Sequence, residues 1–107
     1  MKTPRILKYL NEKSIFQFQA SSNYTYLFFK NGRKEISAYT LKVYEDLFDE
    51  EEFVKIDRSN LVRKDFISRI IKKDNVHIVE LINSTEIQIP RRRKRTMMLE
   101  YPSLFAG

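Results

Sequence analysis

The first part of the chain alternates between apolar and polar positions, which is typical of strands with one buried face. Aromatic and β-branched residues fill 14–29, and the small polar residues of 20–23 divide this stretch into two predicted strands joined by a loop. The Asn-Gly pair within 30–33 favours a tight hairpin turn. Residues 34–38 are then expected to form the returning strand.

A short helix is predicted after this strand. Leu41 and Tyr44 begin an apolar pattern at helical spacing, and Thr40 precedes them with a hydroxyl that can accept an early backbone N–H. We expect the helix to end near Phe48. The four carboxylates of 49–52 are expected to form a solvated turn, and a charge guard that orients DNA or a partner is the alternative.

The rest of the chain shows further short alternating patterns, separated by polar residues typical of turns. They predict strands at 53–56, 61–63, 76–82 and 86–89. Pro90 ends the last strand or precedes a helix, because proline lacks an N–H and pre-sets its own φ. Residues 91–101 are predicted to form that helix, with Met97, Met98 and Tyr101 as its apolar stripe. Roughly seven strands and two short helices make the chain mainly β and largely antiparallel.

Composition and charge narrow the possible partners. The chain has 107 residues, of which 42% are hydrophobic, and we expect a single domain over 1–107. Twenty Lys and Arg residues outnumber fourteen Asp and Glu residues, and the net charge of +6 favours a polyanion as partner. The N-terminus lacks the apolar run of a signal peptide, and no apolar stretch approaches the roughly 20 residues that span a bilayer. A cytoplasmic protein without a membrane partner is therefore expected.

The sequence contains few of the residues that catalysis commonly uses. His77 is the sole histidine and lies in a predicted strand, where a packed or surface role is favoured over that of a catalytic base. Without cysteine there is no thiolate nucleophile, no disulfide and no ordinary zinc site, and two glycines cannot build a phosphate-binding loop. We therefore expect no enzymatic activity, no metal site and no cofactor.

Basic and polar residues gather at three places. The strongest is a run of five cations: Arg91, Arg92, Arg93, Lys94 and Arg95. These charges repel one another, and binding to phosphates would relieve that repulsion. A solvated helix start or a localisation signal is the alternative interpretation of this run. The second place is Arg58, with Arg63 and Lys64 close behind, and the third is Ser22 with Asn23, whose hydroxyl and amide groups can bond phosphates or base edges.

Taken in order, four segments resemble the LytTR family of bacterial DNA-binding domains, and the similarity covers residues 6–100. The segments are 16–24, 41–48, 53–63 and 87–90 with the arginines that follow. The third is the most specific, because the family usually has His-Arg-Ser there, preceded by Phe and followed by an aromatic residue and then Val-Asn. In this chain Asp57 replaces the histidine, Asn60 the aromatic residue and Arg63 the asparagine. The closing Pro-Val-Ser-Arg-Arg of the family also differs, since Arg91 and Arg92 replace Val and Ser.

The resemblance implies a fold of elongated antiparallel β sheets with one or two short helices and no helix-turn-helix. It also implies a bacterial transcription regulator that inserts loops into successive major grooves and commonly bends its DNA. The implied partner is double-stranded DNA, bound at direct repeats by two copies, and a homodimer is a possible assembly. Many relatives carry an N-terminal receiver domain, for which these 107 residues leave no room.

Carried over by position, the contact candidates are Asn23, Arg58 and Arg93 with Lys94. Asn23 can form hydrogen bonds with adenine, and Arg58 and Arg93 can each form bidentate hydrogen bonds with guanine. Ser22 and the remaining cations Arg91, Arg92 and Arg95 can hold phosphates. Asp57 can form an ion pair with Arg58 or accept a hydrogen bond from cytosine N4.

The leading hypothesis is therefore sequence-specific binding of duplex DNA. A competing hypothesis is an RNA-binding or ribosome-associated β module that stacks bases on Phe16, Tyr24, Tyr26 and Phe28, although strand alternation favours the core for most of these rings. A third is a protein-interaction module whose basic tail meets an acidic partner. Preference for duplex DNA over single-stranded RNA separates the first two.

Overall fold

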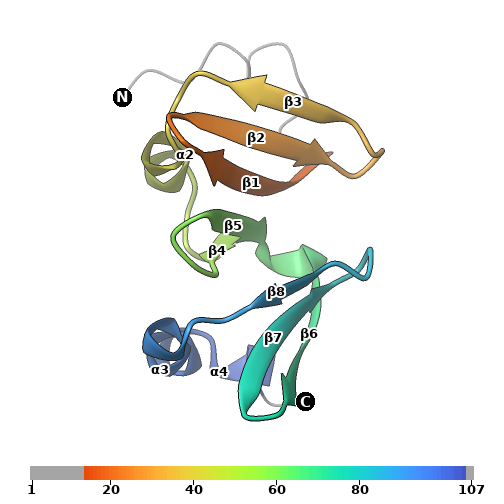
Figure 1. The fold of residues 1–107 in the computed structure, drawn as a ribbon, viewed down its shortest axis with the longest axis vertical. Coiled ribbons are helices and arrows are strands. Elements are labelled where there is room, and N and C mark those ends of the chain that lie inside the picture. The colour runs from red at the N-terminus through yellow and green to blue at the C-terminus, as the bar shows by residue number, and fades with distance from the viewer. Residues whose placement is uncertain (1–13, 106–107) are drawn as a thin grey trace. The chain divides into compact units, whose positions relative to one another are not determined.

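The structure is a computed structural model that describes residues 14–105. The chain divides into two compact units, Met1–Lys64 and Asp65–Gly107, and each contains one antiparallel sheet (Figure 1). A 3₁₀ turn, Lys64–Phe66, lies at the division between the units. Within residues 14–105, no helix combines the length and the apolar content needed to cross a bilayer.

The first unit contains a five-stranded sheet in the order β3-β2-β1-β5-β4. Its strands are β1 (Ile15–Ser21), β2 (Tyr24–Phe29), β3 (Lys34–Ser37), β4 (Phe53–Lys55) and β5 (Asn60–Arg63). The predicted strands of this half are confirmed, and the burial of β2 alternates with a period of two, as in a strand with one buried and one open face. In β2, for example, Leu27 and Phe29 are buried while Tyr24 is half exposed.

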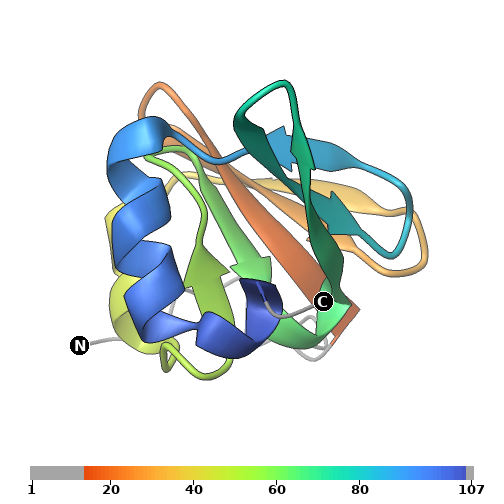
Figure 2. The ribbon, with the colours of Figure 1, turned by 90° about the horizontal axis from the view of Figure 1, so that it is seen from below.

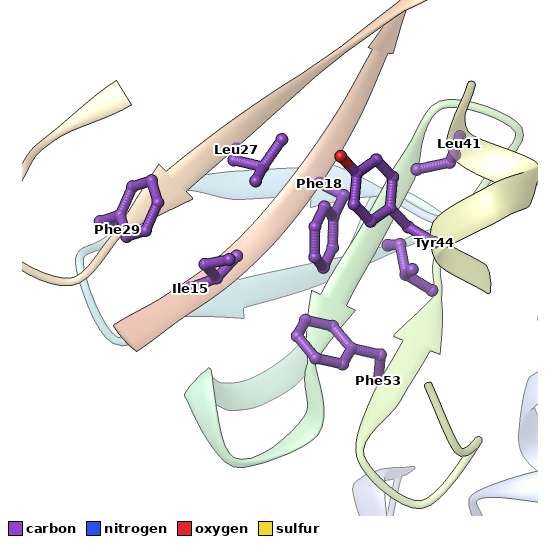
Figure 3. Packing of buried hydrophobic residues seen from close by; sticks show 8 residues of the cluster. Ile15, Phe18, Leu27, Phe29, Leu41, Tyr44 and Phe53 are labelled. Atoms are coloured by element: carbon purple, nitrogen blue, oxygen red, sulfur yellow. The ribbon is translucent and has the colours of Figure 1, made fainter. Parts of the chain in front are cut away.

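The core of the first unit lies between the sheet and helix α2 (Leu41–Leu47). The rings of Phe18 and Tyr44 stack with centroids 4.5 Å apart, and Phe53 tilts against Phe18 at 5.2 Å (Figure 3). These rings point toward one another from β1, α2 and β4, so aromatic contacts join three elements that are distant in sequence. Packing of this kind stabilises a helix of seven residues, which alone would be marginal in water.

The rings proposed for base stacking are only partly in the core, which corrects the expectation for most of them. Phe16 is buried and contacts Phe28 at 6.2 Å, whereas Phe28 and Tyr26 are half-buried. Tyr24, Tyr26 and Phe28 share the face of β2 opposite Leu27, because successive side chains of a strand alternate between faces. The period of two therefore places Tyr24, Tyr26 and Phe28 on the outer face of β2, while Phe29 is buried with Leu27 on the inner face.

Helix α2 ends at Phe48 as predicted, but Thr40 does not cap it through its hydroxyl. The Thr40 side chain is exposed, and the first turn is instead closed by the Thr40 carbonyl oxygen, which accepts a hydrogen bond from Val43 N at 3.1 Å. Ser37 anchors the entry to the helix, since its hydroxyl oxygen accepts bonds from Tyr39 N at 3.1 Å and Tyr44 Oη at 2.5 Å.

The second unit contains a three-stranded sheet in the order β6-β7-β8. Its strands are β6 (Ile67–Lys73), β7 (Val76–Leu81) and β8 (Glu86–Gln88). The strand β6 was not predicted, because a register shift between Ile67 and Arg69 breaks the alternation that identifies a strand. Asp74 and Asn75 form the turn between β6 and β7, and both have positive φ, as short hairpins with matching twist require.

Helices α3 (Arg91–Glu100) and α4 (Pro102–Phe105) follow the second sheet (Figure 2). Helix α3 begins directly after Pro90, as predicted. Met97 and Tyr101 are buried, but Met98 is 44% exposed, which corrects the expected apolar stripe. Residues four apart share a helix face, whereas Met98 is rotated by about 100° from Met97.

Candidate nucleic-acid interface

Two exposed polar turns lie at the same end of the first sheet. Strands β1 and β5 are antiparallel, and Gln19 pairs with Asn60 where β1 approaches its end and β5 begins. The turn that follows β1 and the turn that precedes β5 therefore lie next to each other at this end of the sheet. The backbone joins them directly, because Ala20 N donates to Ser59 O at 2.8 Å.

The first turn consists of Ser22 and Asn23. Strand β1 extends to Ser21, which pairs with Tyr24, so the connection is a two-residue turn and not the longer loop expected over 20–23. Ser22 has a φ of 54°, in the left-handed region that serine rarely adopts. Both turn residues are exposed, and a tight hairpin holds them at the tip of two paired strands.

The second turn carries Arg58, whose side chain is exposed. Asp57 shapes this turn, since its Oδ1 accepts a hydrogen bond from Ser59 N at 2.8 Å. Asn60 Nδ2 also donates to the same carboxylate, at 3.1 Å to Oδ1 and 3.2 Å to Oδ2. In the described part of the chain Asp57 forms no ion pair with Arg58, so that expectation is wrong: the carboxylate is already bonded within the turn.

Sequence reasoning missed the buried amides behind this turn. Gln17 Nε2 donates to Asn60 Oδ1 at 2.7 Å, and Gln19 Nε2 contacts the same oxygen at 3.3 Å. Gln17 and Asn60 are only 6% and 8% exposed. The signal was the Gln-Phe-Gln alternation of 17–19, which places two amides on the face of β1 opposite Phe18.

The cations that follow Arg58 have structural roles. Arg63 is 7% exposed, and its Nε donates to Ile15 O at 2.8 Å. Its guanidinium also lies 4.6 Å from the centroid of the Phe53 ring and 3.6 Å from Glu52. The acidic run forms the predicted turn, in which Glu52 N donates to Asp49 O at 2.9 Å. Glu52 of the acidic run therefore offsets the positive charge of the buried Arg63.

The five-cation run belongs to the second unit, in the first half of α3. Arg91, Arg92 and Arg95 are exposed, whereas Arg93 and Lys94 are half-buried. No acidic residue occurs in the first turn of α3, so positive side chains face the positive end of the helix dipole. An anion at this helix start would relieve both sources of repulsion.

His77 is a strand residue, as predicted. Its ring packs edge-on against Phe105 at 5.9 Å, and its Nδ1 is buried without a hydrogen-bond partner among the described residues. Burial lowers the pKa of His77, and the positive charges of Lys94 and Lys72 lower that pKa further. Between residues 14 and 105, acidic and histidine side chains form no group arranged to hold a metal ion.

Comparisons with known proteins identify the family and the fold of the chain. The model of the LytTr DNA-binding domain family matches residues 6–100, a range that covers most of each unit. Among solved structures, the chain is similar to the LytTr DNA-binding domain of a Bacillus cereus protein described as a methyl-accepting/DNA response regulator. The TM-score is 0.72 at 16% identity, over 81% of this chain and 80% of that chain, so this likeness concerns the fold. The search of curated proteins finds no match. Because the family model matches most of its length, the chain belongs to the LytTR family, the DNA-binding domains of transcription regulators.

Proposed function

We propose that this chain binds double-stranded DNA in a sequence-specific manner, with loops entering the major groove. The observation that carries the proposal is the coupled pair of exposed turns at one end of the first sheet. Asn23 and Arg58 project from elements held by strand pairing and buried amides, and not from long mobile loops. Rigid placement of this kind suits base readout, which depends on hydrogen-bond geometry.

Base contacts and phosphate contacts are assigned to different residues. The amide of Asn23 forms hydrogen bonds with adenine, and the guanidinium of Arg58 forms bidentate hydrogen bonds with guanine. Arg91, Arg92 and Arg95 are exposed and bind phosphates, while Ser22 adds a hydroxyl contact. Arg93 and Lys94 are half-buried, so their contact with DNA requires a rearrangement of their side chains.

Two copies of the chain are proposed to bind direct repeats. A single pair of turns reads few base pairs, and a second copy on an adjacent repeat multiplies specificity without new contacts in either copy. A homodimer in the absence of DNA is the other arrangement, and the spacing of selected sites separates the two.

Selection of binding sites from random duplexes, followed by a salt titration, tests this function. We expect a direct-repeat motif to be enriched and a log-log salt slope of about −4 to −5, for roughly five neutralised phosphates per copy. If no sequence is enriched, the specific-binding proposal is wrong.

A second candidate function is binding of single-stranded RNA. The half-exposed Tyr24 and the Tyr26 ring, with Lys34 Nζ 4.1 Å from its centroid, lie on the open face of β2 and could stack bases. Single-stranded RNA should then compete better than unselected duplex for the protein. We expect the duplex to compete better.

A further inference from the structure

We propose that Asp57 is a positioning residue that sets the orientation of Arg58 for base readout, without itself contacting DNA. This inference rests on the proposed function, since it concerns how the Arg58 turn is held. The contacts of the Asp57 carboxylate support it. They are directed at Ser59 in the turn itself and at Asn60 at the start of β5, the two residues that follow Arg58.

The first contact closes the turn locally. Asp57 Oδ1 accepts from Ser59 N at 2.8 Å, which is the geometry of an Asx turn. Arg58 is the residue enclosed by this bond. The bond restricts the backbone on either side of Arg58 and thereby the direction in which its side chain leaves the turn.

The second contact ties the carboxylate to the buried part of the sheet. Asn60 Nδ2 donates to both carboxylate oxygens, while Asn60 Oδ1 accepts from Gln17 Nε2 at 2.7 Å. Only one orientation of the Asn60 amide fits, because the reverse would place its oxygen against the carboxylate and its NH₂ against another NH₂. The chain of bonds from Gln17 through Asn60 to Asp57 is therefore directional.

The third contact couples this turn to its neighbour. Ser59 O accepts from Ala20 N at 2.8 Å, two residues before Ser22. This backbone bond holds the Arg58 turn against the end of β1, so the direction of Arg58 is fixed relative to the first turn.

Three substitutions at Asp57 separate positioning from charge. Asp57→Asn keeps an oxygen that can accept from both Ser59 N and Asn60 Nδ2, but it removes the negative charge and the longer bond from Asn60 Nδ2 to the second oxygen. Asp57→Glu keeps the charge but adds a methylene that moves the carboxylate away from Ser59 N. Asp57→Ala removes both. The readout is the selectivity ratio, defined as the affinity for the selected duplex divided by the affinity for an unselected duplex.

Positioning predicts that Asp57→Asn keeps the selectivity ratio within about twofold, whereas Asp57→Glu and Asp57→Ala lower it by about tenfold, as loss of one bidentate base contact would. It also predicts non-additivity with Arg58→Ala. The double variant Asp57→Ala with Arg58→Ala should be no less selective than Arg58→Ala alone, since Asp57 acts through Arg58.

Three results would overturn the inference. Equal loss of selectivity in Asp57→Asn and Asp57→Ala, confined to one base pair, would show a direct base contact. Retained selectivity in Asp57→Glu would show that charge and not position matters. Additive losses in the double variant would show that Asp57 acts independently of Arg58.

The same series of variants also checks whether each protein folds and whether the proposed DNA binding itself holds. If Asp57→Ala does not fold by circular dichroism, the comparison of Asp57→Asn with Asp57→Glu still decides between position and charge. If the unmodified chain binds selected and unselected duplexes equally, the proposed function fails and the inference fails with it. If the unmodified chain is selective but Asp57→Ala is equally selective, only the inference fails.

Discussion

Nη1 of Arg93 lies 2.7 Å from Oε1 of Glu100, about two helical turns further along α3. Both side chains are largely covered, with 22% and 33% of their surfaces exposed. Of the five cations of α3 that are proposed to contact DNA, Arg93 therefore has an anionic partner within its own helix. To contact a base or a phosphate, Arg93 must leave Glu100, which lowers the net gain from that contact.

Replacing Glu100 by Gln should therefore raise the affinity for duplex DNA. We expect a gain of about 0.5 to 1 kcal/mol, because the variant replaces the charged acceptor of Arg93 by a weaker neutral amide and removes a charge that repels phosphate. Asp74→Asn is the matched control, since Asp74 lies in an exposed turn of the same unit and carries the same charge. Equal gains for both variants, measured at one salt concentration, would mean that the Arg93 pair is irrelevant to binding.

Replacing Arg93 by Ala tests its assigned base contact. We expect a loss of about 1 to 3 kcal/mol in specific binding and a relaxed preference at one base pair, if Arg93 forks onto guanine. Arg95→Ala removes the same charge from an exposed position of α3. That control should weaken binding to all duplexes alike and reduce the magnitude of the salt slope by about 1. An unchanged base preference in Arg93→Ala removes Arg93 from the site.

The strands and turns that follow local rules could be predicted from the sequence. The Asn-Gly turn is an example: Gly32 has a φ of 92°, which a glycine adopts without strain. The strand β6 could not be predicted from the sequence, because its bulge depends on pairing with Leu81 and Glu80 of the neighbouring strand β7. Local patterns carry no information about such register shifts.

The sequence suggested the candidate site residues one by one but not the hydrogen bonds that link their neighbours. Asp57 and Asn60 are both departures from the usual family pattern, and the structure shows that they bond to each other at 3.1 and 3.2 Å. The partner of Asn60 on the other side, Gln17, is 43 residues away in the chain. Sequence spacing cannot reveal a bond across that separation, so the role proposed for Asp57 depends on contacts that only the fold shows.

Truncating two aromatic residues on opposite faces of the first sheet should have unequal effects on stability. Phe18→Ala is expected to lower the free energy of unfolding by about 3 to 5 kcal/mol, since Phe18 is fully buried among other rings. Tyr26→Ser should cost less, about 1 to 2 kcal/mol, because Tyr26 is half-buried and lies on the opposite face. Urea denaturation of both variants measures the difference, and equal losses would place Tyr26 in the core after all.

Stability should also depend on the protonation of His77. The folded state lowers the pKa of His77 below its unfolded value of about 6.5, so the unfolded chain binds the proton more readily. The free energy of unfolding should therefore be highest above about pH 6.5 and fall as the pH drops below that value. The edge contact with Phe105 and the nearby Lys94 and Lys72 favour the neutral ring.

Urea denaturation between about pH 5.5 and 8 measures this dependence, because ordinary carboxylates stay ionised over that range. His77 is the sole histidine, so His77→Gln serves as a control that keeps a polar side chain without a titrating ring. The control should show a flatter dependence of stability on pH than the unmodified chain. A rise in the stability of the unmodified chain on acidification would contradict the assigned direction of the pKa shift, because protonation would then favour the folded state.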